Sequence, residues 1–190
     1  MIYPQNLWHQ IISHKYRLLL ILLVLVAIII GAIIKTNCVT FIDNKPNLTD
    51  KQRIEELVKQ FYAEFEDIPW LSPREFLTQR QSKTWVILDV RPQVERDISM
   101  IPEALTLEQF ERKAYQDNHV LVYCTVGYRS GLYVRELQEE GIKAFNLWGG
   151  VLAWALEGEA FVTPNGQKTS KVHVYGRKWN VLPKGYEAIW

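Results

Sequence analysis

The sequence predicts an α/β fold with a mostly parallel central sheet and helices on both faces. Three short apolar runs rich in β-branched and aromatic residues, 85–90, 119–123 and 143–147, have the length and composition of buried strands. Segments of helical character lie between them, at 107–116 and 130–140. Strands that alternate with helices in this way form parallel sheets through right-handed crossovers. A ligand site is therefore expected at the carboxyl ends of the strands.

Two further helices are predicted before the first of these strands. Thr49 and Gln52 form a capping-box pattern, and apolar residues then recur at helical spacing to about Glu66. Ser72 caps the second helix, since proline follows it and Glu75 stands three positions on. We expect the first helix to pack on the domain through its apolar stripe, with a dimerising face as the alternative.

A lone cysteine follows the second predicted strand and precedes a helix that Gly141 ends. The connecting loop reads Cys-Thr-Val-Gly-Tyr-Arg-Ser from Cys124 to Ser130. Backbone N–H groups of such a loop form a concave arc at a helix N-terminus, which stabilises an anion, and Arg129 adds a full positive charge. Cys124 as a buried small hydrophobe is the alternative, but the surrounding loop favours a reactive thiolate.

This loop resembles that of the rhodanese-like sulfurtransferases, which reads Cys-x-x-Gly-x-Arg-Ser in many single-domain members. Two further family motifs lie in order around it, and together the three cover about residues 68–157. They are Leu88-Asp-Val-Arg91 followed by Glu95, and Asn146-Leu-Trp-Gly-Gly150 with Trp154. The family usually has Gly-His-Ile-Pro-Gly-Ala where this chain has Ser99-Met-Ile-Pro-Glu-Ala104. We expect that departure to affect local packing more than chemistry.

The resemblance implies a sulfurtransferase that carries sulfur as a persulfide on Cys124, the expected catalytic residue. The donor would be thiosulfate or a persulfide and the acceptor a thiol or cyanide, with no cofactor. The residues expected to bind substrate are Thr125, Val126, Gly127, Tyr128, Arg129 and Arg91. The alternative for Asp89 and Arg91 is a structural ion pair. We expect a tight turn and its packing, not a ligand site, from four residues of the third motif: Trp148, Gly149, Gly150 and Trp154.

The same motifs are compatible with two other functions. Related phosphatases on the same scaffold have a loop one residue longer, His-Cys-x5-Arg, whereas here Tyr123 precedes the cysteine and four residues separate Cys124 from Arg129. This length favours sulfur over phosphate, and arsenate reduction is the allied alternative. The second alternative is a non-enzymatic rhodanese-like module that tethers or regulates a partner at the membrane, although inactive members usually lose the cysteine.

Composition excludes several classes of site. The chain has 190 residues and a formal net charge of +1, without a basic stripe, so nothing indicates a nucleic-acid partner. Its two cysteines, Cys38 and Cys124, are too few for a disulfide framework. The four histidines show no ligand spacing with cysteines or carboxylates, so no metal site is expected.

Residues 18–34 form an uninterrupted apolar run, which predicts one N-terminal transmembrane helix. As a helix the run would span about 25 Å at ~1.5 Å per residue, and it lacks the polar face of a buried soluble helix. A cleaved signal peptide is the alternative. Flanking charges slightly favour a cytoplasmic N-terminus and an extracytoplasmic domain.

These features divide the chain into five parts. Residues 1–17 precede the transmembrane helix and residues 35–48 form a polar linker after it. The rhodanese-like domain with its leading amphipathic helix covers 49–158, and 159–190 form an aromatic extension. Within this extension, Asn165-Gly166 predicts a hairpin between residues 161–168 and 171–175. The aromatic residues either cover the domain or form a surface for a protein partner of unknown identity.

Overall fold

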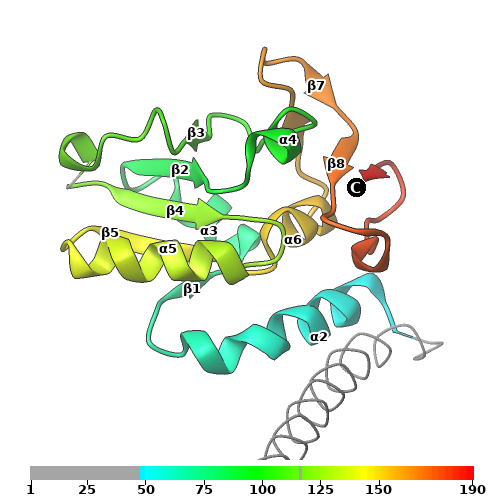
Figure 1. The fold of residues 1–190 in the computed structure, drawn as a ribbon, viewed down its shortest axis with the longest axis horizontal. Coiled ribbons are helices and arrows are strands. Elements are labelled where there is room, and N and C mark those ends of the chain that lie inside the picture. The colour runs from blue at the N-terminus through cyan, green and yellow to red at the C-terminus, as the bar shows by residue number, and fades with distance from the viewer. Residues whose placement is uncertain (1–47, 116) are drawn as a thin grey trace, which may run out of the picture. The chain divides into compact units, whose positions relative to one another are not determined.

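A five-stranded parallel sheet lies at the centre of residues 48–115 and 117–190, the part of the chain that the computed structural model describes (Figure 1). The strand order is β1-β5-β4-β2-β3, and every neighbouring pair is parallel. The strands are β1 Trp70–Leu71, β2 Trp85–Asp89, β3 Leu105–Thr106, β4 His119–Tyr123 and β5 Lys143–Leu147. The predicted α/β fold with a mostly parallel sheet is confirmed.

Helices cover both faces of this sheet, as predicted. The α-helices are α2 Asp50–Tyr62, α3 Pro73–Gln79, α4 Gln93–Arg96, α5 Tyr128–Glu139 and α6 Gly150–Leu156. On one face, Val86, Leu88 and Val122 of the strands share a hydrophobic core with Val134 and Leu137 of α5. The opposite face is covered by α3 and α6.

The packing of α3 and α6 follows from the alternation of side chains along β2. Trp85 points away from the α5 face and meets Phe76 of α3, with ring centroids 5.3 Å apart. Phe76 in turn contacts Trp154 of α6 at 6.2 Å. Burial on both faces explains why the strands read as continuous apolar runs.

Both predicted capping boxes are present. The Thr49 side chain accepts a hydrogen bond from the backbone N–H of Gln52, whose side chain accepts from the N–H of Thr49. Ser72 and Glu75 make the same reciprocal pair at the start of α3. These hydrogen bonds satisfy backbone donors that a helix leaves free at its first turn.

The helix predicted at 107–116 is wrong. The chain there forms a turn followed by a short 3₁₀ helix, η2 Arg112–Tyr115. Phe110 is buried, and its ring stacks on that of Tyr115 with centroids 5.3 Å apart. Residues five positions apart point in different directions on an α-helix, so a continuous helix would separate these two rings.

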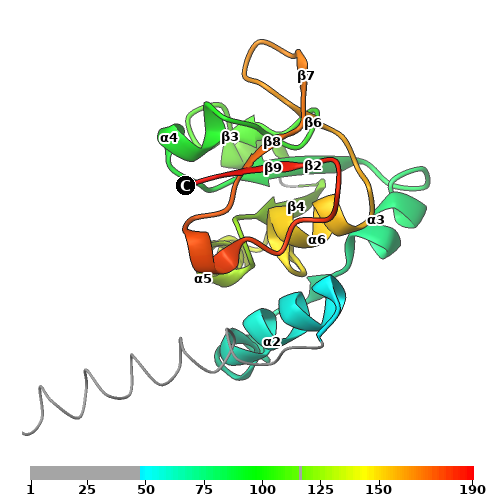
Figure 2. The same cartoon turned by 90° about the vertical axis from the view of Figure 1, so that its right-hand side faces the viewer.

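The aromatic extension forms two small sheets at the carboxyl ends of the central strands (Figure 2). In the first, β6 Phe161–Val162 pairs antiparallel with β7 Lys168–Thr169, so a hairpin does turn at Asn165-Gly166, but its second arm is 168–169 and not 171–175. In the second, β8 Lys171–His173 pairs in parallel with β9 Glu187–Ile189. The predicted pairing of 171–175 with 161–168 is wrong, because residues 171–173 pair with the end of the chain instead.

The predicted transmembrane helix, residues 18–34, lies outside the described residues, as do the N-terminal flank and nearly all of the linker. Within residues 48–115 and 117–190, no helix is long and apolar enough to cross a membrane.

The segment from Ser99 to Ala104, which differs from the usual family motif, contains a residue with a left-handed backbone. Glu103, which stands where the family usually has glycine, adopts a φ of 66°. A left-handed backbone is strained for a residue with a Cβ atom. The side chain of Glu103 forms an exposed ion pair with Arg80 at 3.0 Å, which offsets little of that strain.

We expect Glu103→Gly to raise the free energy of unfolding of the 190-residue chain above that of Glu103→Gln by about 1 kcal/mol. Both variants lose the Arg80 ion pair, so their difference isolates the backbone strain. Thermal or urea unfolding provides the measurement. Equal stabilities for the glycine and glutamine variants would show that Glu103 is unstrained.

Candidate active site

Cys124 directly follows β4, at the carboxyl ends of the strands where the fold places a ligand site. The residue is only 1% exposed. The backbone N–H of Gly127 donates to its Sγ atom at 3.2 Å, and the oxygen of the Ser130 hydroxyl lies 3.5 Å from the same sulfur. Gly127 is the N-cap of α5 and Ser130 lies in its first turn, so the sulfur atom lies at the helix N-terminus as predicted.

The start of α6 orients the carbonyl groups of the cysteine loop. The backbone N–H of Val151 donates to the Cys124 carbonyl at 3.0 Å, and that of Leu152 donates to the Thr125 carbonyl at 3.4 Å. In a trans peptide the C=O and the next N–H point in opposite directions. The N–H groups of Thr125 and Val126 therefore face away from α6.

Gly150 allows this close approach. A Cβ atom at Gly150 would lie 2.7 Å from the carbonyl carbon of Thr125 and closer still to the carbonyl oxygen of Cys124. Gly150 also has a φ of 51°. The expectation that this glycine belongs to a tight turn and its packing agrees with the structure, and the partner it packs against is the cysteine loop.

Gly127 ends the loop under two constraints. Its φ of 115° is a glycine conformation, and a Cβ atom there would lie 2.8 Å from the Trp70 ring. Asn146 of β5 donates to the Gly127 carbonyl at 2.8 Å and accepts from the Ser130 hydroxyl at 2.6 Å. Asn146 is fully buried, so β5 fixes both the loop and the serine that approaches the sulfur.

Arg129 is paired with Glu95 by two hydrogen bonds, at 2.7 and 2.9 Å. The Thr125 hydroxyl, also in this network, donates to Glu95 at 3.1 Å and accepts from Arg129 at 3.0 Å. Glu95 is 3% exposed, whereas the Arg129 side chain is 31% exposed. The guanidinium thus ties the loop to α4 and still reaches solvent.

The charge of Arg129 shifts the titration of its partner. Burial alone would raise the pKa of Glu95, but the hydrogen bonds and charge of Arg129, the charge of Arg91 and the Thr125 hydroxyl lower it below its usual value. Glu95 therefore remains ionised at neutral pH.

The prediction that Arg91 binds substrate is wrong. Its side chain is 0% exposed and makes a bidentate pair with Asp89, whose carboxylate also accepts from the Tyr123 hydroxyl at 2.6 Å. Arg91 donates further to the Ser99 carbonyl at 2.6 Å. Tyr123 also accepts from the backbone N–H of Ile101. The structural ion pair considered for Asp89 and Arg91 is the one observed, and it links the end of β2 to the last residue of β4 and to Ser99.

A cavity of about 160 Å³ opens at Cys124. Five of its lining residues come from the loop: Cys124, Thr125, Val126, Tyr128 and Arg129. The others are Phe61 of α2 and, from the aromatic extension, Tyr175 and Trp179. Sequence reasoning did not assign these three to the site, because long-range packing alone brings them to the loop and their spacing carries no such signal.

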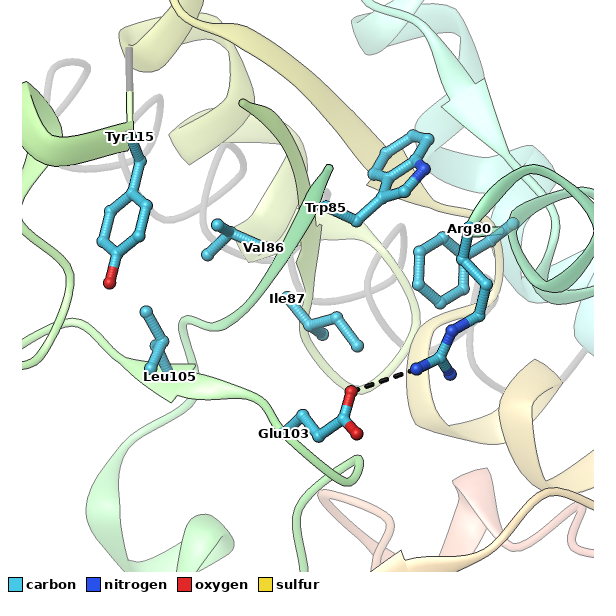
Figure 3. Close-up of a pocket in the computed structure, with 8 residues that line it drawn as sticks. Arg80, Trp85, Val86, Ile87, Glu103, Leu105 and Tyr115 are labelled. Carbon is cyan, nitrogen blue, oxygen red and sulfur yellow. Dashed lines mark hydrogen bonds and ion pairs between the residues drawn. The ribbon is translucent and has the colours of Figure 1, made fainter. Parts of the chain in front are cut away.

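A second cavity, of about 260 Å³, lies at the other end of β2 (Figure 3). Trp85, Val86 and Leu105 line it, and the Arg80–Glu103 ion pair closes one side. No Cys, Ser, Thr or His side chain lines it. The described residues also contain no group of three His, Cys, Asp or Glu side chains that could hold a metal ion.

Comparison with known proteins identifies the family. Residues 72–157 match the rhodanese-like domain. A sulfurtransferase of Allochromatium vinosum is 35% identical in an alignment 100 residues long, and the match covers 48% of this chain and 94% of that protein. The chain therefore belongs to the rhodanese-like family.

Two further similarities are more limited. A tRNA uridine(34) hydroxylase of Chlamydia muridarum is 32% identical in an alignment 101 residues long, and the match covers 46% of this chain and 31% of that protein. The crystal structure of a rhodanese-related protein from Thermoplasma volcanium is 20% identical, with a TM-score of 0.42, over 50% of this chain and 97% of that one.

We predict that Gly150→Ala destabilises the chain by about 3 kcal/mol or more and slows alkylation of Cys124, because its Cβ atom would displace the loop backbone. Gly141→Ala is the matched control. Gly141 also has a positive φ, of 80°, but nothing lies within 4 Å of the added Cβ atom. We expect the control to lose about 1 kcal/mol through strain alone. Similar losses in both variants would contradict the close approach of Gly150 to the loop.

We predict that Glu95→Gln lowers the free energy of unfolding by about 2 kcal/mol at pH 7, because a buried partner of Arg129 loses its charge. The pKa of Glu95 is lower in the folded chain than in the unfolded chain. Its contribution is therefore complete above the unfolded pKa of about 4.3 and is lost as pH falls through the folded pKa. The difference between wild type and variant should shrink in urea titrations below about pH 4.

The control for this experiment is Glu55→Gln, which removes the charge from an exposed ion pair with Lys51. We expect a change within about 0.5 kcal/mol for the control. A deficit in Glu95→Gln that stays constant from pH 7 to pH 3 would contradict the ionic role of Glu95.

Proposed function

We propose that this protein is a sulfurtransferase that moves a sulfane sulfur through a persulfide on Cys124. The donor is thiosulfate or a persulfide, and the acceptor is a thiol or cyanide. The single observation that carries the proposal is the position of the Cys124 sulfur, in a cavity at a helix N-terminus with a backbone N–H donor at 3.2 Å. Membership of the rhodanese-like family and a sulfurtransferase relative support it.

In the first step, the Cys124 thiolate attacks the outer sulfur of the donor. A new S–S bond forms, the S–S bond of the donor breaks, and its electron pair leaves with sulfite when thiosulfate is the donor. The product is a persulfide anion on Cys124. Loop N–H groups that face away from α6 stabilise this anion, as donors do in an oxyanion hole.

In the second step, a nucleophilic acceptor attacks the terminal sulfur of the persulfide. Cyanide leaves as thiocyanate, or a thiolate leaves as a persulfide, and the electron pair returns to the Cys124 sulfur as thiolate. Neither step needs net proton transfer when both nucleophiles are ionised. No side chain is required as a general base.

We predict that Cys124→Ser reduces thiosulfate:cyanide sulfur transfer to the uncatalysed rate, because a hydroxyl group cannot form a persulfide. The serine occupies the same space, so the unfolding transition should change little. The control is Cys38→Ser, which we expect to retain activity.

Loss of activity in Cys38→Ser with retention in Cys124→Ser would show that the site is assigned wrongly. Absence of transfer in the folded wild type with thiosulfate and with organic donors alike would favour the non-enzymatic module.

We also propose that residues 18–34 anchor the chain in a membrane as a single span, with the domain on the extracytoplasmic side. The uninterrupted apolar run in the sequence supports this proposal. Residues 47–190 form a separate compact unit, which is consistent with a catalytic domain that does not need the anchor.

We predict that the 190-residue chain stays in the membrane pellet after a carbonate wash, whereas a chain without residues 1–46 is recovered in the soluble fraction. An apolar helix without a polar face remains in the bilayer under these conditions. Recovery of the intact chain in the supernatant, or a mature N-terminus near residue 35, would rule out the anchor.

A further inference from the structure

Four aromatic side chains form a continuous rim around the cavity at Cys124. This aromatic rim consists of Phe61, Tyr128, Tyr175 and Trp179, all of which line the cavity. The ring centroid of Phe61 lies 5.1 Å from that of Tyr128 and 6.5 Å from that of Trp179. Trp179 in turn lies 5.2 Å from Tyr175. Two of the four come from the extension, beyond the residues that match the family.

Tyr175 is held in this rim at a conformational cost. It adopts a φ of 69° although it is not glycine, and such strain persists only where surrounding contacts hold it. Its backbone N–H donates to Nδ1 of His173 at 3.2 Å, and the guanidinium of Arg129 lies 5.8 Å from its ring centroid. Tyr175 is 60% exposed, so the strained backbone places its side chain at the entrance of the cavity and not in the core.

The cavity offers little uncompensated positive charge. Among its eight lining residues Arg129 is the only charged one, and its guanidinium is already neutralised by Glu95 at 2.7 and 2.9 Å. A dianion such as thiosulfate would compete with this carboxylate for Arg129. An organic cation would meet Arg129 on the face of Tyr175. The aromatic rim therefore suits an uncharged, flat apolar group, and the end of the cavity at Cys124 suits one anionic sulfur.

We infer that the sulfur donor is a small organic molecule with an aromatic or similarly flat apolar group, such as an aryl thiosulfonate or aryl persulfide, bound by the aromatic rim. This inference rests on the proposed sulfur transfer through Cys124 and favours an organic donor over thiosulfate. With an aryl thiosulfonate, Cys124 attacks the outer sulfur and the S–S bond to the sulfonyl sulfur breaks. The aryl sulfinate leaves with the electron pair, and the persulfide anion remains.

The test compares benzenethiosulfonate with methanethiosulfonate, two monoanions with the same reacting group, using cyanide as acceptor. Each kcat/KM is divided by the uncatalysed rate of the same donor with cyanide. We expect the 190-residue chain to favour the aryl donor at least about tenfold, the scale of one or two ring contacts. In Trp179→Ala this ratio should fall to about three or less. Because the ratio is measured within one preparation, partial unfolding of a variant does not alter it.

Trp190→Ala is the matched control. Trp190 belongs to the same extension and is 54% exposed, but it packs on Arg177 and does not line the cavity. We expect the control to keep the wild-type ratio. Equal ratios in wild type and Trp179→Ala would overturn the inference, as would a larger kcat/KM with thiosulfate than with benzenethiosulfonate.

Product binding separates this inference from the proposed function. Calorimetry with benzenesulfinate and methanesulfinate measures the rim without any turnover. If benzenesulfinate binds more tightly than methanesulfinate and Trp179→Ala removes the difference, the aromatic rim binds an aryl group. If, in addition, no donor gives sulfur transfer, the proposed function is wrong and the binding role of the rim still holds. Equal binding of the two sulfinates overturns the rim and leaves the proposed function standing.

Discussion

The backbone of Gly150 lies directly against the cysteine loop, and the orientation of the loop depends on this contact. With no side chain in the way, the first amides of α6 reach the carbonyls of Cys124 and Thr125 at 3.0 and 3.4 Å. Those carbonyls are turned towards α6, so the N–H groups that follow them face the other way. A loop with the same sequence but a looser support would expose carbonyls to an anionic sulfur and repel it.

Two further residues, Asn146 and Glu95, hold the rest of the loop in place. Asn146 fixes the carbonyl of Gly127 and the hydroxyl of Ser130, while Glu95 holds Thr125 and Arg129. These supports are buried and come from β5 and α4. The loop itself is therefore rigid where the sulfur sits, while the aromatic rim above it comes from α2, the loop and the extension.

Most of the fold could be predicted from the sequence, because strands buried on both faces carry an unmistakable apolar pattern. This holds for β2, β4 and β5, and for the capped helices α2 and α3. The two-residue strands β1 and β3 are too short for any period to appear, and the helix expected at 107–116 is broken by the stacking of Phe110 on Tyr115. Such features depend on contacts between distant segments.

The candidate site was predictable where it is local in sequence. The residues from Cys124 to Arg129 form one loop, and their spacing alone placed the sulfur at the N-terminus of a helix. Arg91 was misplaced because a motif residue near a strand end can point inward as easily as outward, and here Asp89 holds it in the core. Tyr175 and Trp179, which line the cavity, lie between β8 and β9, and the pairing of these two strands is a contact that no local pattern predicts.

The central claim is that Cys124 stores a sulfane sulfur in this loop. Intact mass measurement of the 190-residue chain, after incubation with thiosulfate or benzenethiosulfonate and removal of the donor, tests it most directly. We expect a gain of one sulfur atom, mapped to the peptide that contains Cys124 and removed again by cyanide. No gain from either donor on the folded chain, or a sulfur atom mapped to Cys38, would contradict it.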